Sequence, residues 1–156
     1  MGETTFVIEP GRQDIVMTRV FDAPRDLVYR AVTEPELIAR WWGPRRFTTV
    51  IDRMEARPGG RWRWINKGAD SSEHAFFGVH HAMSPEQIVR TFEYEGAPGH
   101  VSLETLTLDE VPGGTRYQTV GVFQSVTDRD MAVASGMEGG ARETMDRLEE
   151  TLGELR

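Results

Sequence analysis

Residues 137–155 read MEGGARETMDRLEETLGEL, and their pattern sets the architecture that the remaining chain must complete. Its apolar side chains recur at intervals of 4, 3, 4 and 3, at Ala141, Met145, Leu148, Leu152 and Leu155. That spacing places them on one face of an α-helix, while arginine, glutamate and aspartate side chains fill the solvent side. The pattern predicts a long C-terminal helix whose single apolar face needs another layer of structure to cover it.

The covering layer is predicted from a run of short strands that precedes this helix. Stretches rich in β-branched and aromatic residues are separated by turns that contain glycine and proline. Because these turns are short, neighbouring strands must run antiparallel. Trp62 and Trp64 alternate with Arg61 and Arg63, which is typical of a strand with one buried face. The expected strands span residues 47–56, 60–66, 73–82, 87–95, 101–109 and 114–124.

The first part of the chain predicts one more strand and two short helices. Residues 14–21 are strand-like, and Pro24 suits the first turn of a helix because its missing N–H is not needed there. Thr33 and Glu36 have the spacing of a capping box, which predicts the start of a second helix that Gly43 and Pro44 end. Residues 1–13 are interpreted as a short polar tail, so that residues 14–156 form a single domain.

Composition excludes several classes of function. The chain has 156 residues, no cysteine, and a net charge of −7 with a pI near 5.1. Disulfides, thiolate metal sites and a cysteine nucleophile are therefore absent, and an acidic protein is a poor binder of nucleic acid. The sequence shows no secretory signal and no apolar run of the roughly 18 residues that a membrane span needs. We expect a cytoplasmic protein of one domain.

Short motifs spread over nearly the whole chain resemble those of a known family. The sequence resembles the helix-grip fold of the START/Bet v 1-like (SRPBCC) superfamily, and more narrowly the family named after the activator of the heat-shock-protein-90 ATPase. The motifs that carry the resemblance are Arg19–Pro24, Thr33–Leu37, Trp41–Pro44, Arg57–Trp62, Gly78, Ser84–Glu86, Ser135–Glu138 and Asp146–Leu148.

This resemblance implies an α+β fold in which a curved antiparallel sheet of about seven strands wraps around the long C-terminal helix. Its order would be one strand, two short helices, six strands and the helix. Members of the superfamily include binders of small hydrophobic ligands, cyclase-like enzymes, self-resistance proteins and co-chaperone domains. No catalytic set carries over from the family to this chain, and no cofactor is implied.

The main functional hypothesis is a binding module for a small hydrophobic or amphipathic molecule. A strongly twisted sheet that curls around one helix can leave a space between them, and a ligand would lie there. Aromatic and methionine side chains would supply adaptable apolar walls. The residues expected to face this space are Trp62, Trp64, Phe76, His80, Phe92, Tyr94, Tyr117, Met137, Ala141 and Met145.

The histidines do not predict a metal site. His80 and His81 are adjacent in a strand and point to opposite faces, whereas His74 and His80 share a face but lie roughly 20 Å apart along it. His80 falls on the face of Phe76 and is expected to point inward. It could then orient a ligand or act as a general base near neutral pH, although a core histidine bonded to a neighbour is the more ordinary interpretation.

Two alternative functions stay open at this point. One is a cyclase, dehydratase or hydrolase that uses the same space, with His80 and an inward carboxylate as base and acid; Asp52, Glu93 and Glu104 are the candidates, though solvated positions are more ordinary for them. The other is a protein-interaction domain that uses the convex face of the sheet, where Phe77 and Val79, if they point outward, would supply an apolar patch for a homodimer or a chaperone partner. A chaperone partner is less expected, because only the short tail precedes the domain.

Overall fold

The structure is a computed structural model that describes residues 2–156, and it contains one sheet and four helices. Their bounds are β1 Thr5–Val7, β2 Asp14–Phe21, α1 Arg25–Thr33, α2 Pro35–Trp41, β3 Phe47–Met54, β4 Arg61–Gly68, β5 Glu73–Met83, β6 Gln87–Tyr94, β7 Val101–Val111, β8 Gly114–Phe123, α3 Val126–Ala134 and α4 Met137–Leu155.

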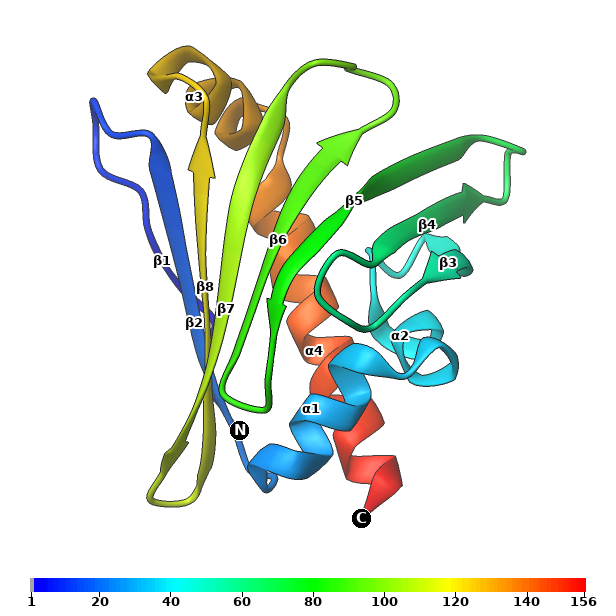
Figure 1. Cartoon of the computed structure of the whole chain (residues 1–156), viewed down its shortest axis with the longest axis vertical. Coiled ribbons are helices and arrows are strands. Elements are labelled where there is room, and N and C mark those ends of the chain that lie inside the picture. Colours follow the sequence, from blue (N-terminus) through cyan, green and yellow to red (C-terminus); the bar gives the residue numbers. More distant parts are fainter. Residues whose placement is uncertain (1) are drawn as a thin grey trace.

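All strands belong to one antiparallel sheet in the order β1-β2-β8-β7-β6-β5-β4-β3. The sheet curves around α4, and α1 and α2 lie beside the C-terminal half of that helix (Figure 1). The α+β helix-grip fold is thereby confirmed, and the long helix has the predicted bounds. The strand bounds agree to within about two residues because hydrophobic alternation and turn residues are local signals.

The N-terminal stretch differs from the prediction of a polar tail. Residues 5–7 form β1, which pairs with β2 and raises the number of strands to eight. Thr4 is buried, and the Arg19 guanidinium donates to its hydroxyl at 3.0 Å. Arg129 of α3 also donates to the backbone oxygen of Glu9 at 2.8 Å. Three residues carry too little periodicity to identify a strand from sequence, but buried arginines in the domain hold this stretch in place.

The capping box predicted at Thr33 and Glu36 is wrong. Helix α1 continues through Thr33, whose hydroxyl donates to the backbone oxygen of Tyr29 at 2.6 Å. Glu34 is the residue that precedes α2, and its side chain makes no capping hydrogen bond. A threonine hydroxyl can bond back to the preceding turn as readily as forward to the next helix.

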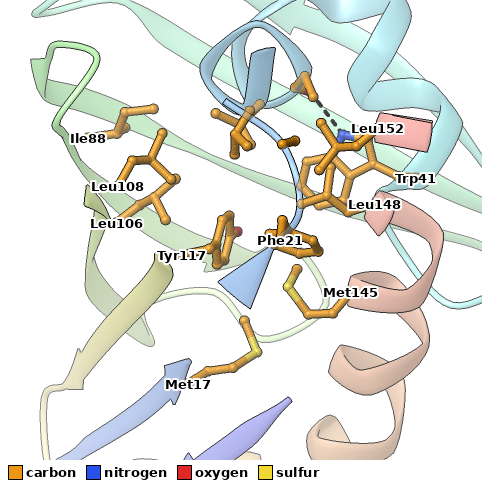
Figure 2. Close-up of a cluster of buried hydrophobic side chains, with 14 residues drawn as sticks. Met17, Phe21, Trp41, Ile88, Leu106, Leu108, Tyr117, Met145, Leu148 and Leu152 are labelled. Atoms are coloured by element: carbon orange, nitrogen blue, oxygen red, sulfur yellow. Dashed lines mark hydrogen bonds between the residues drawn. The ribbon is translucent and has the colours of Figure 1, made fainter. Parts of the chain in front are cut away.

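One apolar cluster joins the sheet to the C-terminal half of α4. Met145, Leu148 and Leu152 are 2% exposed or less and form the helix side of this cluster. Figure 2 shows Tyr117 and Phe21 facing Met145 across the interior. The indole of Trp41 joins the cluster from α2 and donates to the backbone oxygen of Ala31 at 2.9 Å. The amphipathic face read from the sequence is thus the face that packs.

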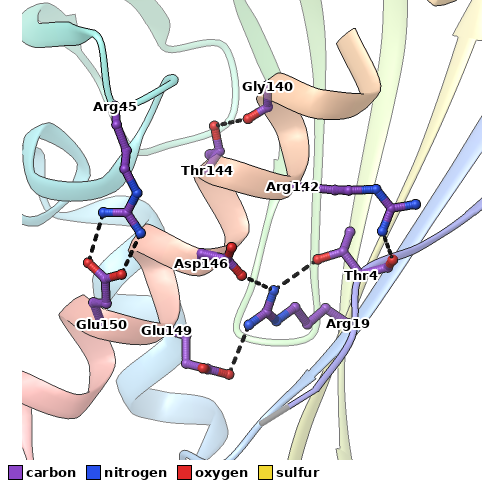
Figure 3. A network of polar contacts seen from close by, with 9 residues as sticks. All are labelled: Thr4, Arg19, Arg45, Gly140, Arg142, Thr144, Asp146, Glu149 and Glu150. Atoms are coloured by element: carbon purple, nitrogen blue, oxygen red, sulfur yellow. Dashed lines mark hydrogen bonds and ion pairs between the residues drawn. The ribbon is translucent and has the colours of Figure 1, made fainter. Parts of the chain in front are cut away.

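Ion pairs and hydrogen bonds from two arginines hold the other sides of α4 (Figure 3). Arg19 of β2 donates to Asp146 at 2.7 Å and to Glu149 at 3.0 Å, although its own side chain is only 5% exposed. On the opposite side, Arg45 of the α2–β3 loop donates two hydrogen bonds to the carboxylate of Glu150. These contacts fix the helix between the sheet and the loop that follows α2.

Candidate functional site

A second apolar cluster covers the other end of the concave face and is built from aromatic rings. Trp62 and Trp64 of β4 are each 1% exposed, with ring centroids 4.6 Å apart, and Trp42 packs edge-on against Trp64 at 5.1 Å. The half-buried rings extend the wall: Phe92 lies 5.6 Å from Trp62, Phe76 lies 5.4 Å from Phe92, and Tyr94 stacks on Phe76 at 5.0 Å. We call these six residues the aromatic wall.

A row of polar residues crosses the sheet between the aromatic wall and the first cluster. His80 of β5 is paired with Arg90 of β6, Arg90 with Glu104 of β7, and Glu104 with Gly121 of β8. All four lie on the concave face: His80 and Arg90 are themselves buried, and Leu106 and Thr119, two residues from Glu104 and Gly121 in alternating strands, are buried as well. We call His80, Arg90 and Glu104 the polar row, and Gly121 lies at its end. Charged groups in the middle of an apolar face are costly to bury unless they are paired.

Arg90 is the centre of the polar row. Its guanidinium donates from Nε and Nη2 to one carboxylate oxygen of Glu104, at 3.0 and 2.8 Å. The side chains of Arg90 and Glu104 are 8% and 24% exposed, so the ion pair is largely desolvated. The guanidinium also lies 4.9 Å from the ring centroid of Trp64 and 5.3 Å from that of Trp62, which adds cation–π attraction.

His80 is fully buried, and its protonation state follows from its partners. Its Nδ1 lies 3.0 Å from the backbone oxygen of Glu55, which can only accept, so Nδ1 carries the proton. Burial, and then the charge of Arg90, lower the pKa of His80 to about 4. The ring is therefore neutral near pH 7, and Nε2 presents a lone pair. This Nε2 has no hydrogen-bond partner among the described residues.

One donor near Arg90 is also left without a partner among the described residues. Trp64 Nε1 is buried and makes no hydrogen bond within residues 2–156, whereas Trp62 Nε1 donates to the backbone oxygen of Thr91 at 3.2 Å. Burial and the charge of Glu104 raise the pKa of Tyr117, which keeps its hydroxyl protonated. Buried polar atoms of a native protein are nearly always satisfied, so such atoms mark positions where a further polar group, a ligand or an ordered water, can bind.

Gly121 leaves space at the end of the polar row. A side-chain carbon added there would meet no atom within 4 Å, although the residue shares the concave face with Tyr117 and Thr119. At Gly78, by contrast, an added carbon would lie 2.0 Å from the backbone oxygen of Thr91. Gly78 is thus required by close packing of the wall, and Gly121 is not.

The structure divides the predicted ligand residues between the two clusters. Trp62, Trp64, Phe76, Phe92 and Tyr94 lie in the aromatic wall, and His80 adjoins it through Arg90. Tyr117, Ala141 and Met145 belong to the first cluster, and Met137 is half-buried at the start of α4. The inward orientation of His80 is confirmed by its burial. That these residues bind a ligand stays a prediction.

Sequence reasoning did not include Arg90 and Gly121 among the site residues, and for Glu104, one of its candidate inward carboxylates, it favoured a solvated position. A signal was available, because Arg90 falls between Ile88 and Phe92 in an alternating strand, and Glu104 falls two residues before Leu106. Asp52, another carboxylate considered for the interior, is exposed and accepts from Arg63 at 3.2 Å. A β-bulge between Ile51 and Arg53 breaks the alternation there.

Two surface hollows lie away from the predicted residues. One of about 160 Å³ is lined by Phe21, Asp22, Glu149, Leu152 and Arg156. The other, of about 200 Å³, is lined by Gly2, Glu3, Thr4, Arg19, Arg142 and Asp146. Trp62, Trp64 and His80 are closed off from solvent, and they line neither hollow.

The convex face carries a row of small apolar residues. Val7, Val16 and Val120 are paired in register across β1, β2 and β8, and Thr105 and Val89 continue the row. Phe77, expected on this face, is half-buried there. Homodimer formation through the convex face stays a prediction.

Within residues 2–156, no helix is long and apolar enough to cross a membrane, and no three histidine or carboxylate side chains gather to hold a metal ion.

Comparison with known families identifies the chain. The model of the family described as "Activator of Hsp90 ATPase homolog 1-like protein" matches residues 22–153, which run from the end of β2 almost to the end of α4. The chain belongs to this family. The Hsp90 ATPase activator-like family shares the SRPBCC fold, whose members commonly bind hydrophobic ligands. No curated protein matches the chain by sequence.

Solved structures share the fold of this chain. A crystal structure from Rhodobacter sphaeroides has a TM-score of 0.89 at 25% identity and covers 97% of this chain and 98% of its own. A solution structure from Arthrobacter aurescens has a TM-score of 0.88 at 22% identity, with 96% and 91% covered. A protein from Mycobacterium smegmatis gives 0.85 at 22% identity, with 94% and 95% covered. The polar row and the aromatic wall therefore lie on the concave face of a helix-grip fold.

Proposed function

We propose that this chain binds a small, mostly apolar molecule on the concave face of the sheet, between the aromatic wall and helix α4. The observation that carries the proposal is the polar row, which places His80, Arg90 and Glu104 among apolar side chains beside the open position of Gly121. A core that served stability alone would gain from apolar residues there, because buried ion pairs contribute little net stability.

The aromatic wall suits this function. Its inner tryptophans are fixed by packing, whereas Phe76, Phe92 and Tyr94 are half-buried and form the accessible part. Flat rings present large apolar areas, and offset or edge-on contacts between rings add about 0.5–1.5 kcal/mol each. From the other side, Ala141 and Met145 of α4 offer a small and an adaptable side chain.

The chemistry of His80 favours binding over acid–base catalysis. General bases work best when their pKa lies near the working pH. The buried ring of His80, with its pKa lowered to about 4, is a weak base at neutral pH but a good hydrogen-bond acceptor. The polar row is therefore better suited to orient a ligand than to remove its protons.

The test is a thermal-shift screen of the protein against small apolar and amphipathic compounds. A ligand present at 100 times its Kd adds about 2.7 kcal/mol, which raises the melting temperature of a domain of this size by several degrees. The variant Gly121→Val fills the open position and is expected to fold, because valine is well suited to a strand. The variant Ala141→Trp fills the same interior from the helix side.

We expect ligands that shift the melting temperature of the wild type to lose their effect in Gly121→Val. The control is Val122→Leu, which enlarges the next residue on the exposed convex face and leaves the interior unchanged. A full shift retained in both interior variants would contradict the placement of the site. No shift from any compound in a broad library would contradict the proposed function.

A further inference from the structure

The polar row limits which ligands the site can accept. Resting on the proposed function, we propose that the ligand is a neutral molecule with an apolar ring and a hydroxyl-type donor, which donates to Nε2 of His80, and that carboxylate ligands are rejected. The argument rests on the charge balance of the interior, on the free lone pair of the imidazole, and on the shape and donors of the aromatic wall.

The interior carries no net charge to offer a charged ligand. Arg90 and Glu104 form an ion pair and cancel, His80 is neutral, and Tyr117 is protonated. The nearest further cation along the sheet, Arg19, is paired with Tyr117 in register and is already bound to Asp146 and Glu149. A carboxylate brought into this space would be a buried charge without a counter-ion, which disfavours its binding strongly.

The lone pair of His80 calls for a donor on the ligand. Its Nδ1 carries the proton and donates to the Glu55 carbonyl. A change to the other tautomer would make Nε2 a donor but would lose that hydrogen bond, so Nε2 stays an acceptor. The side chain is 0% exposed, and bulk water therefore does not serve the free nitrogen. A hydroxyl on the ligand would satisfy it, whereas an ether oxygen at the same position would set two acceptors against each other.

The aromatic wall supplies the complementary half of the site. The buried Nε1 of Trp64 has no acceptor within residues 2–156, and the oxygen of a hydroxyl or carbonyl on the ligand can accept from it. The half-buried rings of Phe76 and Phe92 lie 5.4 Å apart at 32°, a tilted arrangement that leaves ring faces and edges for a further flat ring. A flat, neutral, hydroxyl-bearing ring matches both features.

The experiment compares three probes of nearly equal size by isothermal titration calorimetry at about pH 7.5, where a phenolic hydroxyl is neutral. The probes are 2-naphthol, 2-methoxynaphthalene and 2-naphthoate. We expect 2-naphthol to bind about tenfold or more tightly than 2-methoxynaphthalene, because the ether leaves the buried acceptor of His80 unpaired. Binding of 2-naphthoate should be weaker than that of the ether.

Two variants test which side-chain atoms cause the preference for 2-naphthol over the ether. His80→Phe removes the acceptor, and we expect the preference for 2-naphthol over the ether to fall to about one, whereas His81→Phe on the exposed opposite face retains it. Should His80→Phe fail to fold, Trp64→Phe removes the indole N–H that has no partner among the described residues. We expect it to weaken the binding of 2-naphthol several-fold. Its control is Trp41→Phe, which removes an indole N–H that is already bonded to the backbone of Ala31.

Each outcome decides between the claims. Equal binding of naphthol and ether would mean that the imidazole is satisfied in another way, and this would overturn the inference while leaving the proposed function intact. Equal or tighter binding of 2-naphthoate would overturn the neutrality of the ligand, again without touching the proposed function. Absence of binding by all three probes, together with an empty thermal-shift screen, would contradict the proposed function itself.

Discussion

At the scale of single residues, His80 makes the stability of the protein depend on pH. Its pKa is about 4 in the folded chain against an ordinary value of 6.5, so the unfolded chain binds the proton more readily. Stability from this group is therefore complete above about pH 6.5 and is lost as the pH falls toward 4. A shift of this size corresponds to about 3 kcal/mol across the window.

Urea unfolding of the wild type and of His80→Phe at several pH values measures this contribution. Carboxylates such as Glu55 and Glu95 also have lowered pKa values, and their effect is common to both proteins. The free energy of unfolding of the wild type should fall by about 3 kcal/mol more than that of the variant between about pH 6.5 and 4. Parallel curves for the two proteins would show that His80 titrates normally.

At the scale of elements, α4 is tied to the end of α2 by Arg147. The guanidinium donates to the backbone oxygens of Gly43 at 2.6 Å and of Arg40 at 3.1 Å. The last carbonyls of a helix have no partner within it, so a cation from a neighbouring helix serves as their cap. This contact also positions the loop that follows Trp42, a member of the aromatic wall.

We expect Arg147→Met to lower the free energy of unfolding by about 1–3 kcal/mol, because it removes the donors and keeps most of the side chain's bulk. The control is Arg116→Met, which breaks a surface ion pair with Asp109 and should change stability by less than about 1 kcal/mol. Chemical denaturation with an unchanged m-value checks both. Equal losses in the two variants would show that the cap adds nothing beyond a surface contact.

At the scale of the whole molecule, the N-terminal stretch is part of the domain. Strand β1 closes one edge of the sheet, and Thr4 satisfies Arg19 and Arg142, one through its hydroxyl and the other through its backbone oxygen. Removal of residues 2–8 would leave donors of the buried Arg19 without a partner and would expose the edge of β2.

We expect this truncation to cost about 2 kcal/mol or more and to lower the melting temperature by roughly 5 °C or more. Circular dichroism melts measure the effect. Val7→Thr, which changes an exposed side chain but keeps the strand, should melt like the wild type. A truncated protein with an unchanged melting temperature would restore the interpretation of this stretch as a tail.

The sequence alone specifies the order of the elements from β2 to β8, the bounds of α4 and the family. These depend on local signals: the periodicity of Ala141, Met145, Leu148 and Leu152, alternation in the strands, and turns marked by glycine and proline. The sequence also placed Trp62, Trp64 and His80 on the inner face. Each of these properties is specified by residues close together in the sequence, which is why one amino-acid sequence is enough to predict them.

Tertiary structure decided which polar groups meet. His80, Arg90 and Glu104 come from three strands, and their alignment depends on strand register, which a bulge between His80 and Ala82 shifts by one residue. The strand β1 and the hydroxyl bond of Thr33 were likewise settled by neighbours outside the local pattern. Register and burial are properties of the assembled sheet, because they depend on contacts between residues far apart in the chain, and they placed an ion pair and a free imidazole nitrogen in the interior.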